Sequence, residues 1–442
     1  MYPSVGQIRC SRFLAKPKLF RWRFLHCWAA FILLALIMVL QCNLAFAQPD
    51  TSSPTAASFP RISAETATHQ LVCNASSAFA QIPGQTDFFV GRGMCIGSLD
   101  YCHQVHPEKR AFLALFRMDW KSNKMIFQRK LLAPPDKPAP GIKTPSGVSI
   151  DGCIDPSMVD FHGEKWIAFE GTTMGTNCSC VVPLTPDFTE LDLSRLTVAV
   201  KGVNGPIGKG GVKAGNNTMH AGPNQIVCLH SCSTPWLLNF QGHLYIYWTD
   251  DSFLNDQPDY PIVSRGMELV EDDQGRLWGK GSGGRPVNSN DPNLTCTLRY
   301  PDKSDPASNH VAHLRSAYVF GDKILTFFTL GGDIGNQVCC SPHQTNPGCW
   351  RPVIAIANRP LGDNAFGQAT ADVPSLPCNK IEYPRFILDP SGRKLLLGQF
   401  AALTKTPGGN EGQIVIPDGV TYIPADSIIG EALYGHKIPK GR

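Results

Sequence analysis

The sequence predicts an all-β chain that folds as a five-bladed β-propeller with long loop insertions. A short apolar strand, a tight glycine turn and a second alternating strand recur along the chain. The turn glycines are Gly163, Gly242, Gly321 and Gly392, spaced 79, 79 and 71 residues apart, and such a recurrence indicates a repeat architecture. No stretch of ten or more residues after the N-terminal segment has a convincing helical apolar period. Units of about 65–80 residues with about four strands each are typical of propeller blades with insertions.

Residues 1–47 are expected to form a signal peptide. Six basic residues and no acidic one lead into an apolar run from Cys27 to Leu40, and Ala45-Phe46-Ala47 has the pattern of a signal-peptidase site. We therefore expect cleavage after Ala47 and a secreted or periplasmic/extracellular location. The alternative is an uncleaved membrane anchor, because the 21 residues from Cys27 to Ala47 are long enough to cross a bilayer. A membrane is a partner only in that alternative.

Cleavage also changes the charge balance of the chain. It removes six of the 40 basic residues and none of the 36 acidic ones, so 34 basic residues face 36 acidic ones and the net charge changes from +4 to −2. The basic isoelectric point is therefore a property of the targeting segment. No basic surface typical of nucleic-acid binding is indicated, and we expect no nucleic-acid partner.

The cysteines are consistent with export. Thirteen of the 16 lie after the leader, in predicted loops, and in an oxidising compartment we expect most of them to form disulfides, with at least one left over. The alternative is a metal site made of Cys228, His230 and Cys232 with His220. Its spacing fits no standard zinc module, so we expect no metal and no cofactor.

Residues 48–66 are rich in Pro, Ser, Thr and Ala and are expected to form a flexible linker, followed by the propeller domain over residues 67–442. Leu191 to Leu196 is the best short helical candidate. Alternating apolar runs predict the following strands: Ala111 to Met118, Met125 to Leu132, Trp166 to Glu170, Leu244 to Trp248, Ile324 to Thr329, Val353 to Ala357, Leu395 to Phe400 and Ile414 to Ile416.

A fifth unit is found by register at the start of the domain. Asp155 lies eight residues before its turn at Gly163. In the first unit the turn is expected near Pro107-Glu108-Lys109, and eight residues before Glu108 is Asp100. The five units are thus expected to start near residues 88, 152, 230, 312 and 381.

The opening Ile154-Asp155-Pro156-Ser157, which leads through a glycine turn into an aromatic strand, resembles the five-bladed glycoside hydrolases of the arabinanase, β-xylosidase and levansucrase type. As a pattern the resemblance covers most of the mature chain. It implies a carbohydrate substrate or glycan ligand at the mouth of the axis, where the first strands of all blades converge. Glycoside cleavage needs one carboxylic acid to protonate the leaving oxygen and one carboxylate to activate water or attack.

The resemblance implies a base from blade one, an Asp from blade two that tunes the pKa of the acid, and an acid Glu from blade three. Asp155 matches the second role by its position and its Pro-Ser context, and Asp100 matches the first by register. Blade three departs from the pattern, because Ser233-Thr234-Pro235 has no carboxylate. Glu382-Tyr383-Pro384 on blade five has the Glu-x-Pro form of the acid, and blade five neighbours blade one in a closed ring. Asp155, Glu382 and Asp100 are therefore the candidate catalytic residues.

Arg315 and Arg385 are candidate substrate-binding residues, because arginines at the axis can bind a uronate or a sulfate by bidentate contacts. His313 is a further candidate at the axis, and Trp236 is a candidate sugar-stacking platform. The alternative is structural: Asp155 caps a strand or turn, Glu382 pairs with Arg385 or Arg315, and aromatic residues pack between blades.

Two function classes remain open from the sequence. One is a glycoside hydrolase, and the other is a non-catalytic glycan- or protein-binding propeller that lost the catalytic acid. The carboxylate missing from blade three favours the second class. Glu382 on blade five favours the first.

Overall fold

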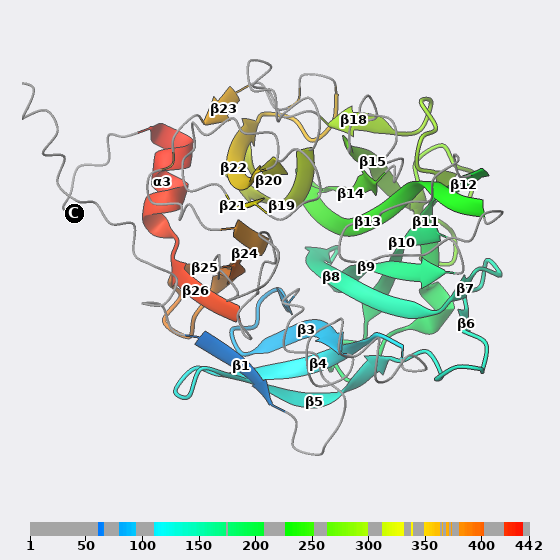
Figure 1. Cartoon of the computed structure of the whole chain (residues 1–442), viewed down its shortest axis with the longest axis horizontal. Coiled ribbons are helices and arrows are strands. Elements are labelled where there is room, and N and C mark those ends of the chain that lie inside the picture. The colour runs from blue at the N-terminus through cyan, green and yellow to red at the C-terminus, as the bar shows by residue number, and fades with distance from the viewer. Residues whose placement is uncertain are drawn as a thin grey trace, which may run out of the picture. The chain divides into compact units, whose positions relative to one another are not determined.

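The computed structural model of the chain contains five β-sheet blades around a central axis (Figure 1). The predicted five-bladed β-propeller is confirmed. All described residues belong to one compact unit, Pro54–Arg442. The structure describes residues 61–65, 79–93, 110–173, 176–206, 226–251, 263–298, 312–330, 337–338, 349–362, 365, 368–370, 373, 380–401 and 420–435.

Blade 2 consists, from the axis outward, of β8 (Gly152–Phe161), β9 (Glu164–Thr173), β10 (Thr176–Leu184) and β11 (Thr197–Lys201). Blade 3 consists of β13 (Ile226–Phe240), β14 (His243–Asp251), β15 (Val263–Glu271) and β16 (Leu277–Gly279), with β12 (Val203–Pro206) paired to β13 and β18 (Cys296–Leu298) paired to β15. The short β17 (Val287–Asn288) leaves blade 3 and pairs in parallel with β11, so it extends the rim of blade 2.

Blades 4, 5 and 1 complete the ring. Blade 4 contains β19 (Ala312–Phe320), β20 (Lys323–Leu330), β22 (Cys349–Ala357) and β23 (Gln368–Thr370), with β21 (Gln337–Val338) paired to β22. Blade 5 contains β24 (Lys380–Leu388), β25 (Lys394–Ala401) and β26 (Val420–Pro424), and blade 1 contains β2 (Ala80–Gln81), β3 (Phe88–Gly93), β4 (Phe112–Asp119) and β5 (Lys124–Leu132). A separate ribbon of β6 (Ile142–Lys143) and β7 (Ser149–Ile150) precedes blade 2.

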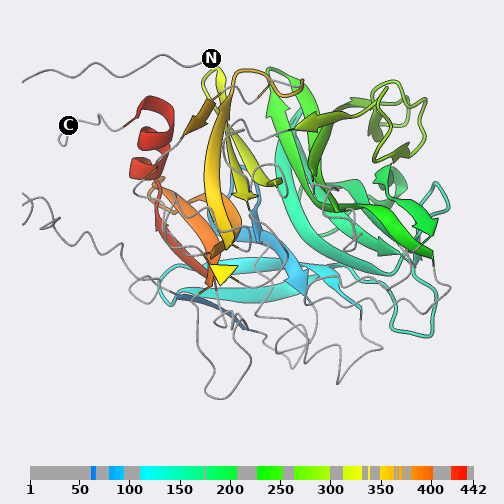
Figure 2. The ribbon, with the colours of Figure 1, turned by 45° about the horizontal axis from the view of Figure 1, so that its top comes forward.

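The strand β1 (Arg61–Glu65) joins the last blade to the first. It pairs antiparallel with β26 and parallel with β5, so blades 5 and 1 form one eight-stranded sheet. Figures 1 and 2 show it between these two blades. The end of the segment predicted as a linker, residues 48–66, is therefore part of the sheet.

Five hydrophobic clusters each lie between two neighbouring blades, and together they close the ring. Even-numbered residues of β9, such as Trp166 and Ala168, pack toward blade 3, whereas Ile167 and Phe169 pack toward blade 1. This alternation follows from the two-residue period of a strand that is covered on both faces. The predicted packing of aromatic residues between blades is confirmed by Trp166, Trp236 and Trp248, which are all buried.

The predicted hairpin turns are also confirmed. Gly163, Gly242, Gly321 and Gly392 have positive φ angles between 64° and 83°, and open space surrounds the position of a Cβ atom at each. In the turns His162-Gly163 and Gln241-Gly242 both residues have positive φ. That is the geometry of a type I′ turn, which strongly favours glycine.

Blade 1 differs from the prediction in the place of its first turn. β2 and β3 form a hairpin around Gly84, which has a φ of 81°, so the first unit begins before residue 88. The segment near Pro107-Glu108-Lys109 belongs to the connection from β3 to β4, and it lies outside the described residues. Because β2 is only two residues long, it carries no alternation from which a strand could be predicted.

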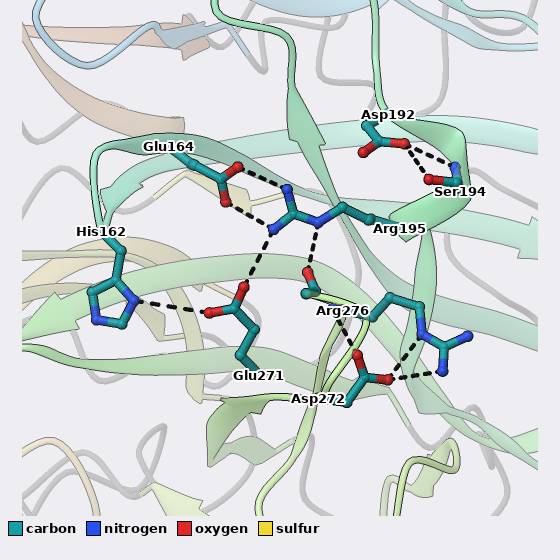
Figure 3. A network of polar contacts seen from close by, with 9 residues as sticks. His162, Glu164, Asp192, Ser194, Arg195, Glu271, Asp272 and Arg276 are labelled. Atoms are coloured by element: carbon teal, nitrogen blue, oxygen red, sulfur yellow. Dashed lines mark hydrogen bonds and ion pairs between the residues drawn. The ribbon is translucent and has the colours of Figure 1, made fainter.

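A polar network ties the short 3-10 helix η2 (Leu193–Arg195) and the start of β9 in blade 2 to the end of β15 and the β15–β16 turn in blade 3 (Figure 3). Arg195 ends η2, within the predicted helical candidate Leu191 to Leu196. Its guanidinium donates two hydrogen bonds to the Glu164 carboxylate, at 2.7 and 2.8 Å. Its Nε donates to the Gly275 carbonyl of blade 3 at 2.6 Å, and Glu271 lies 3.4 Å from Nη2.

One nine-residue helix, α3 (Asp426–Tyr434), follows β26 and packs Ile428, Ile429 and Ala432 against blades 4 and 5. No helix was predicted for these residues from the sequence. Within the described residues, no helix has the length and apolar character required to span a bilayer.

The five cysteines whose side chains are described, Cys153, Cys178, Cys180, Cys232 and Cys296, lie in strands rather than in the predicted loops, and no disulfide joins any two of them. The first four are buried. The side chains of the other cysteines lie outside the described part of the chain, so the prediction of several disulfides stays a prediction.

Candidate functional site

The inner strands of blades 2 to 5 share a β-bulge in their pairing with the second strand, toward the end of the axis opposite the hairpin turns. In each blade the pairing of the first two strands shifts register there. The shifts fall between Ile154 and Ser157, Ser233 and Trp236, Leu314 and Ser316, and Glu382 and Arg385. Bulges bend a strand and redirect its side chains, and they are frequent next to active sites. We therefore take this end of the axis, the axial mouth, as the candidate site.

Asp155 lies in the bulge of blade 2. It has a φ of 52°, in the left-handed region, which Asp tolerates better than most residues. The residue is only 3% exposed. Arg92 on β3 of blade 1 places Nη1 3.9 Å from Asp155 Oδ1, so the carboxylate lies beside a buried positive charge. The structure thus places Asp155 at the mouth, where the repeat register predicts it.

Thr234 is the equivalent of Asp155 in the bulge of blade 3. Its φ is 46°, and a β-branched residue in this conformation carries strain of about 1–3 kcal/mol. Its amide N–H donates to Glu170 Oε2 at 3.0 Å, and its hydroxyl lies 3.1 Å from that of Thr249. A hydrogen bond to a charged group contributes about 1.5–3 kcal/mol, which is comparable with the strain.

Glu170 itself was missed by the sequence analysis. It lies on β9 as the Cα partner of Ile154, the residue before Asp155, and it is 4% exposed. Its second carboxylate oxygen accepts from Asn177 Nδ2 at 2.6 Å. The sequence did contain a signal for this residue: in the alternating row Trp166, Ala168 and Glu170, which is buried, Glu170 is the one charged residue.

Glu382 lies on β24 directly before the bulge of blade 5. By the register of the bulges it corresponds to Ser233 of blade 3 and Ile154 of blade 2, and Tyr383 corresponds to Asp155. Glu382 therefore occupies on blade 5 the backbone position that lacks a carboxylate on blade 3. Its side chain lies outside the described part of the structure, so its proximity to Asp155 stays a prediction.

Asp100 also lies outside the described residues. The first hairpin of blade 1 turns at Gly84, so Asp100 follows this turn instead of lying eight residues before it. Asp100 belongs to the connection between β3 and β4. This connection starts after Gly93, next to Arg92, which contacts Asp155. A place for Asp100 near the mouth therefore stays a prediction.

Trp236 and Arg385 are brought together just beyond the mouth, between blades 3, 4 and 5. The guanidinium carbon of Arg385 lies 4.6 Å from the centre of the Trp236 ring, and the indole Nε1 donates to the Ala317 carbonyl at 2.8 Å. Each residue is 4% exposed. Burial raises the pKa of the neighbouring Tyr318 to about 12, and its hydroxyl oxygen accepts from the Phe386 N–H at 2.8 Å. In this structure the cluster is part of the inter-blade core.

Arg315 and His313 lie near the start of β19. Arg315 is the bulge residue of blade 4, and its Nε donates to the Thr329 hydroxyl at 3.3 Å. His313 is the Cα partner of Thr329, and its side chain lies outside the described part. Among the described residues, no group of three or more His, Cys, Asp or Glu side chains could hold a metal ion.

No protein-family model matches the chain, and no curated protein matches its sequence. Among solved structures, an alpha-L-arabinofuranosidase from Lactobacillus brevis is similar, at 11% identity over 80% of this chain and 92% of that chain, with a TM-score of 0.42. A Bacillus subtilis arabinanase has 8% identity over 79% and 94%, with a TM-score of 0.40. A mannose phosphorylase from Leishmania mexicana has 11% identity over 77% and 84%, with a TM-score of 0.39. At these identities and scores the similarity assigns no family and no activity to this chain.

Proposed function

We propose that the protein is an exported, glycoside hydrolase-like propeller that acts on or binds a carbohydrate at the axial mouth. The observation that carries the proposal is the placement of Asp155. An Asp-Pro-Ser opening lies on the inner strand of a five-bladed ring, and its carboxylate is buried at the bulge beside Arg92. The same opening carries the resemblance to the arabinanase, β-xylosidase and levansucrase type of enzyme.

In the hydrolase form of the proposal, Glu382 is the acid and Asp155 orients it and tunes its pKa. Two nearby carboxyl groups push their pKa values apart, so that one can stay protonated near neutral pH while the other is ionised. The bulge register supports this assignment, because Glu382 holds the position that Ser233 has on blade 3. Asp100 is the proposed base that activates water.

A second function, a glycan-binding module without catalysis, is favoured by the opening of blade 3. Ser233 stands where the family pattern has an acid. The carboxylate that reaches this opening, Glu170, accepts N–H hydrogen bonds on both of its oxygens. Both oxygens are therefore engaged within the fold, which makes Glu170 a poor candidate for the acid that protonates a leaving group. In this form of the proposal, Arg315, which is partly exposed in the bulge of blade 4, takes part in binding, whereas Arg385 is buried between the blades.

The test is an activity and binding screen of the wild-type protein on aryl glycosides and polysaccharides, followed by variants. Asp155→Asn and Glu382→Gln should each lower turnover by about 10²- to 10⁴-fold, the usual contribution of general acid–base catalysis. Asp160→Asn is the matched control, because Asp160 lies on the same strand at the opposite end, where it contacts Lys165 and accepts from the Gly163 N–H at 3.1 Å. Asp160→Asn should leave turnover unchanged.

Each outcome has a distinct meaning. Turnover that persists in both variants would remove Asp155 and Glu382 from the mechanism. Glycan binding without turnover, weakened by Asp155→Asn and not by Asp160→Asn, would establish the binding module. Neither binding nor turnover across the screen would contradict a carbohydrate function.

A further inference from the structure

Blade 2 holds the opening of blade 3 through three side chains that bracket its bulge. Ser179 Oγ donates to the Cys232 carbonyl at 3.2 Å, and Glu170 Oε2 accepts from the Thr234 N–H at 3.0 Å. Beyond the bulge, Ser157 Oγ accepts from the Leu237 N–H at 3.2 Å. The shape of the mouth on blade 3 is therefore set by residues of blade 2.

Glu170 is the charged member of these three residues, and it is coupled to the strand that carries Asp155. Ile154, Glu170 and Ser179 are Cα partners across β8, β9 and β10, so they form one row across the sheet. Glu170 therefore links this row to the bulge of blade 3 through its hydrogen bond with the Thr234 N–H. The strained residue Thr234 lies where the two blades meet at the mouth.

We propose that Glu170 is a positioning residue of the axial site, whose carboxylate holds the blade 3 bulge in its left-handed conformation. The expected effect of Glu170 on ligand binding rests on the proposed function, whereas its hydrogen bond with the Thr234 N–H does not. Glu170 acts here as a hydrogen-bond acceptor. Both of its oxygens are occupied by N–H donors, from Thr234 and from Asn177, which distinguishes this role from that of a general acid.

Three variants separate these roles. Glu170→Ala removes the acceptor. Glu170→Gln keeps one carbonyl oxygen for the Thr234 N–H, and its amide group can pair with Asn177 once that side chain turns its own oxygen toward it. Glu164→Ala is the matched control, because Glu164 lies on the same strand and also contributes to the contact between blades 2 and 3, but at the opposite end.

The first readout is hydrogen exchange at the Thr234 amide, resolved to the residue. We expect exchange about 10-fold faster in Glu170→Ala than in wild type, because the loss of about 1.4 kcal/mol of protection corresponds to a factor of ten. Exchange in Glu170→Gln and Glu164→Ala should stay within about 3-fold of wild type. If Glu170→Ala exchanges no faster than Glu164→Ala, the proposal is overturned.

The second readout is the affinity for linear arabinan, used as the probe. Glu170→Ala should bind about 10-fold or more weakly, since small displacements of positioning groups are costly, whereas Glu170→Gln and Glu164→Ala should bind like wild type. If Glu170→Gln lost as much affinity as Glu170→Ala, the charge would act on the ligand and the positioning role would be wrong. Absence of arabinan binding by wild type would count against the proposed function for this glycan, while the amide-exchange result would still decide the role of Glu170.

Discussion

Replacing Arg195 with alanine should lower the free energy of unfolding by about 2–3 kcal/mol at neutral pH. Arg195 is the centre of the network between blades 2 and 3 shown in Figure 3. Its side chain is 17% exposed. It makes a two-pronged contact with Glu164, donates to the Gly275 carbonyl, and covers the Trp166 ring with its guanidinium carbon 4.8 Å from the ring centre.

The magnitude follows from these separate contacts. The Glu164 side chain is 44% exposed, so solvent screens the ion pair and its contribution is about 1 kcal/mol or less. The hydrogen bond to the Gly275 carbonyl contributes about 1 kcal/mol. The guanidinium over Trp166 contributes about 0.5–1 kcal/mol at such a partly exposed position.

The assay is thermal melting followed by circular dichroism. A loss of 1 kcal/mol shifts the melting temperature by about 2–4 °C in a domain of 150–250 residues, and by less in a larger one. We therefore expect Arg195→Ala to melt about 3–5 °C below wild type. The control is Arg276→Ala, because Arg276 bonds to Asp272 within its own hairpin and stacks on Trp278, without bridging blades. It should shift melting by about 1–2 °C.

The pH dependence provides a second check on the same contact. Hydrogen bonds from Arg195 lower the pKa of Glu164 below its usual value. A carboxyl group whose pKa is lower in the folded state stabilises the fold above its unfolded pKa, about 4.3 for Glu, and this stabilisation is lost as the pH falls. The difference between wild type and Arg195→Ala should therefore shrink from pH 7 to pH values below about 4. A difference no larger than that of Arg276→Ala, or one that grows on acidification, would refute this account.

Three further predictions concern packing, thiols and export. Gly171→Ala should lower the free energy of unfolding by about 1–3 kcal/mol, because a Cβ atom there would lie 2.8 Å from Cys180 Sγ. The melting temperature should fall, and the double variant with Cys180→Ala should recover it. An unchanged melting temperature in Gly171→Ala would contradict this close packing. Burial raises the pKa values of the Cys153 and Cys180 thiols, so these two thiols should not react with Ellman's reagent in the folded protein. After denaturation without reductant, the reagent should detect at least two additional thiols. An unchanged thiol count would contradict this prediction. N-terminal sequencing of the exported protein should begin at Gln48, and a chain that still begins at Met1 and sediments with membranes would favour the uncleaved anchor.

The repeated hairpins could be predicted because their causes are local. At Gly163 and Gly242 a two-residue turn requires positive φ, and alternating apolar residues on both sides show which strands pair. Every predicted strand that falls in the described residues is confirmed; Ile414 to Ile416 lies outside them. The segments that were not predicted include the nine-residue strands β10 and β15, the shorter strands β1 and β2, and the helix α3. β1 in addition obtains its partners from β5 and β26, which are distant along the chain.

The same distinction between local causes and contacts distant along the chain applies to the candidate site. The Asp155 position could be predicted, because the repeat register alone places it at the start of an inner strand. The sequence could not show that Arg92 of blade 1 lies beside it, or that Glu170 accepts from the Thr234 amide 64 residues later. The Arg195 contact with Gly275, 80 residues away, is of the same kind. Turns and strand alternation depend on the chemistry of a few consecutive residues, so the sequence by itself determined them. Side-chain contacts between blades depend on how separately formed sheets pack around the axis, and only the tertiary structure decided those.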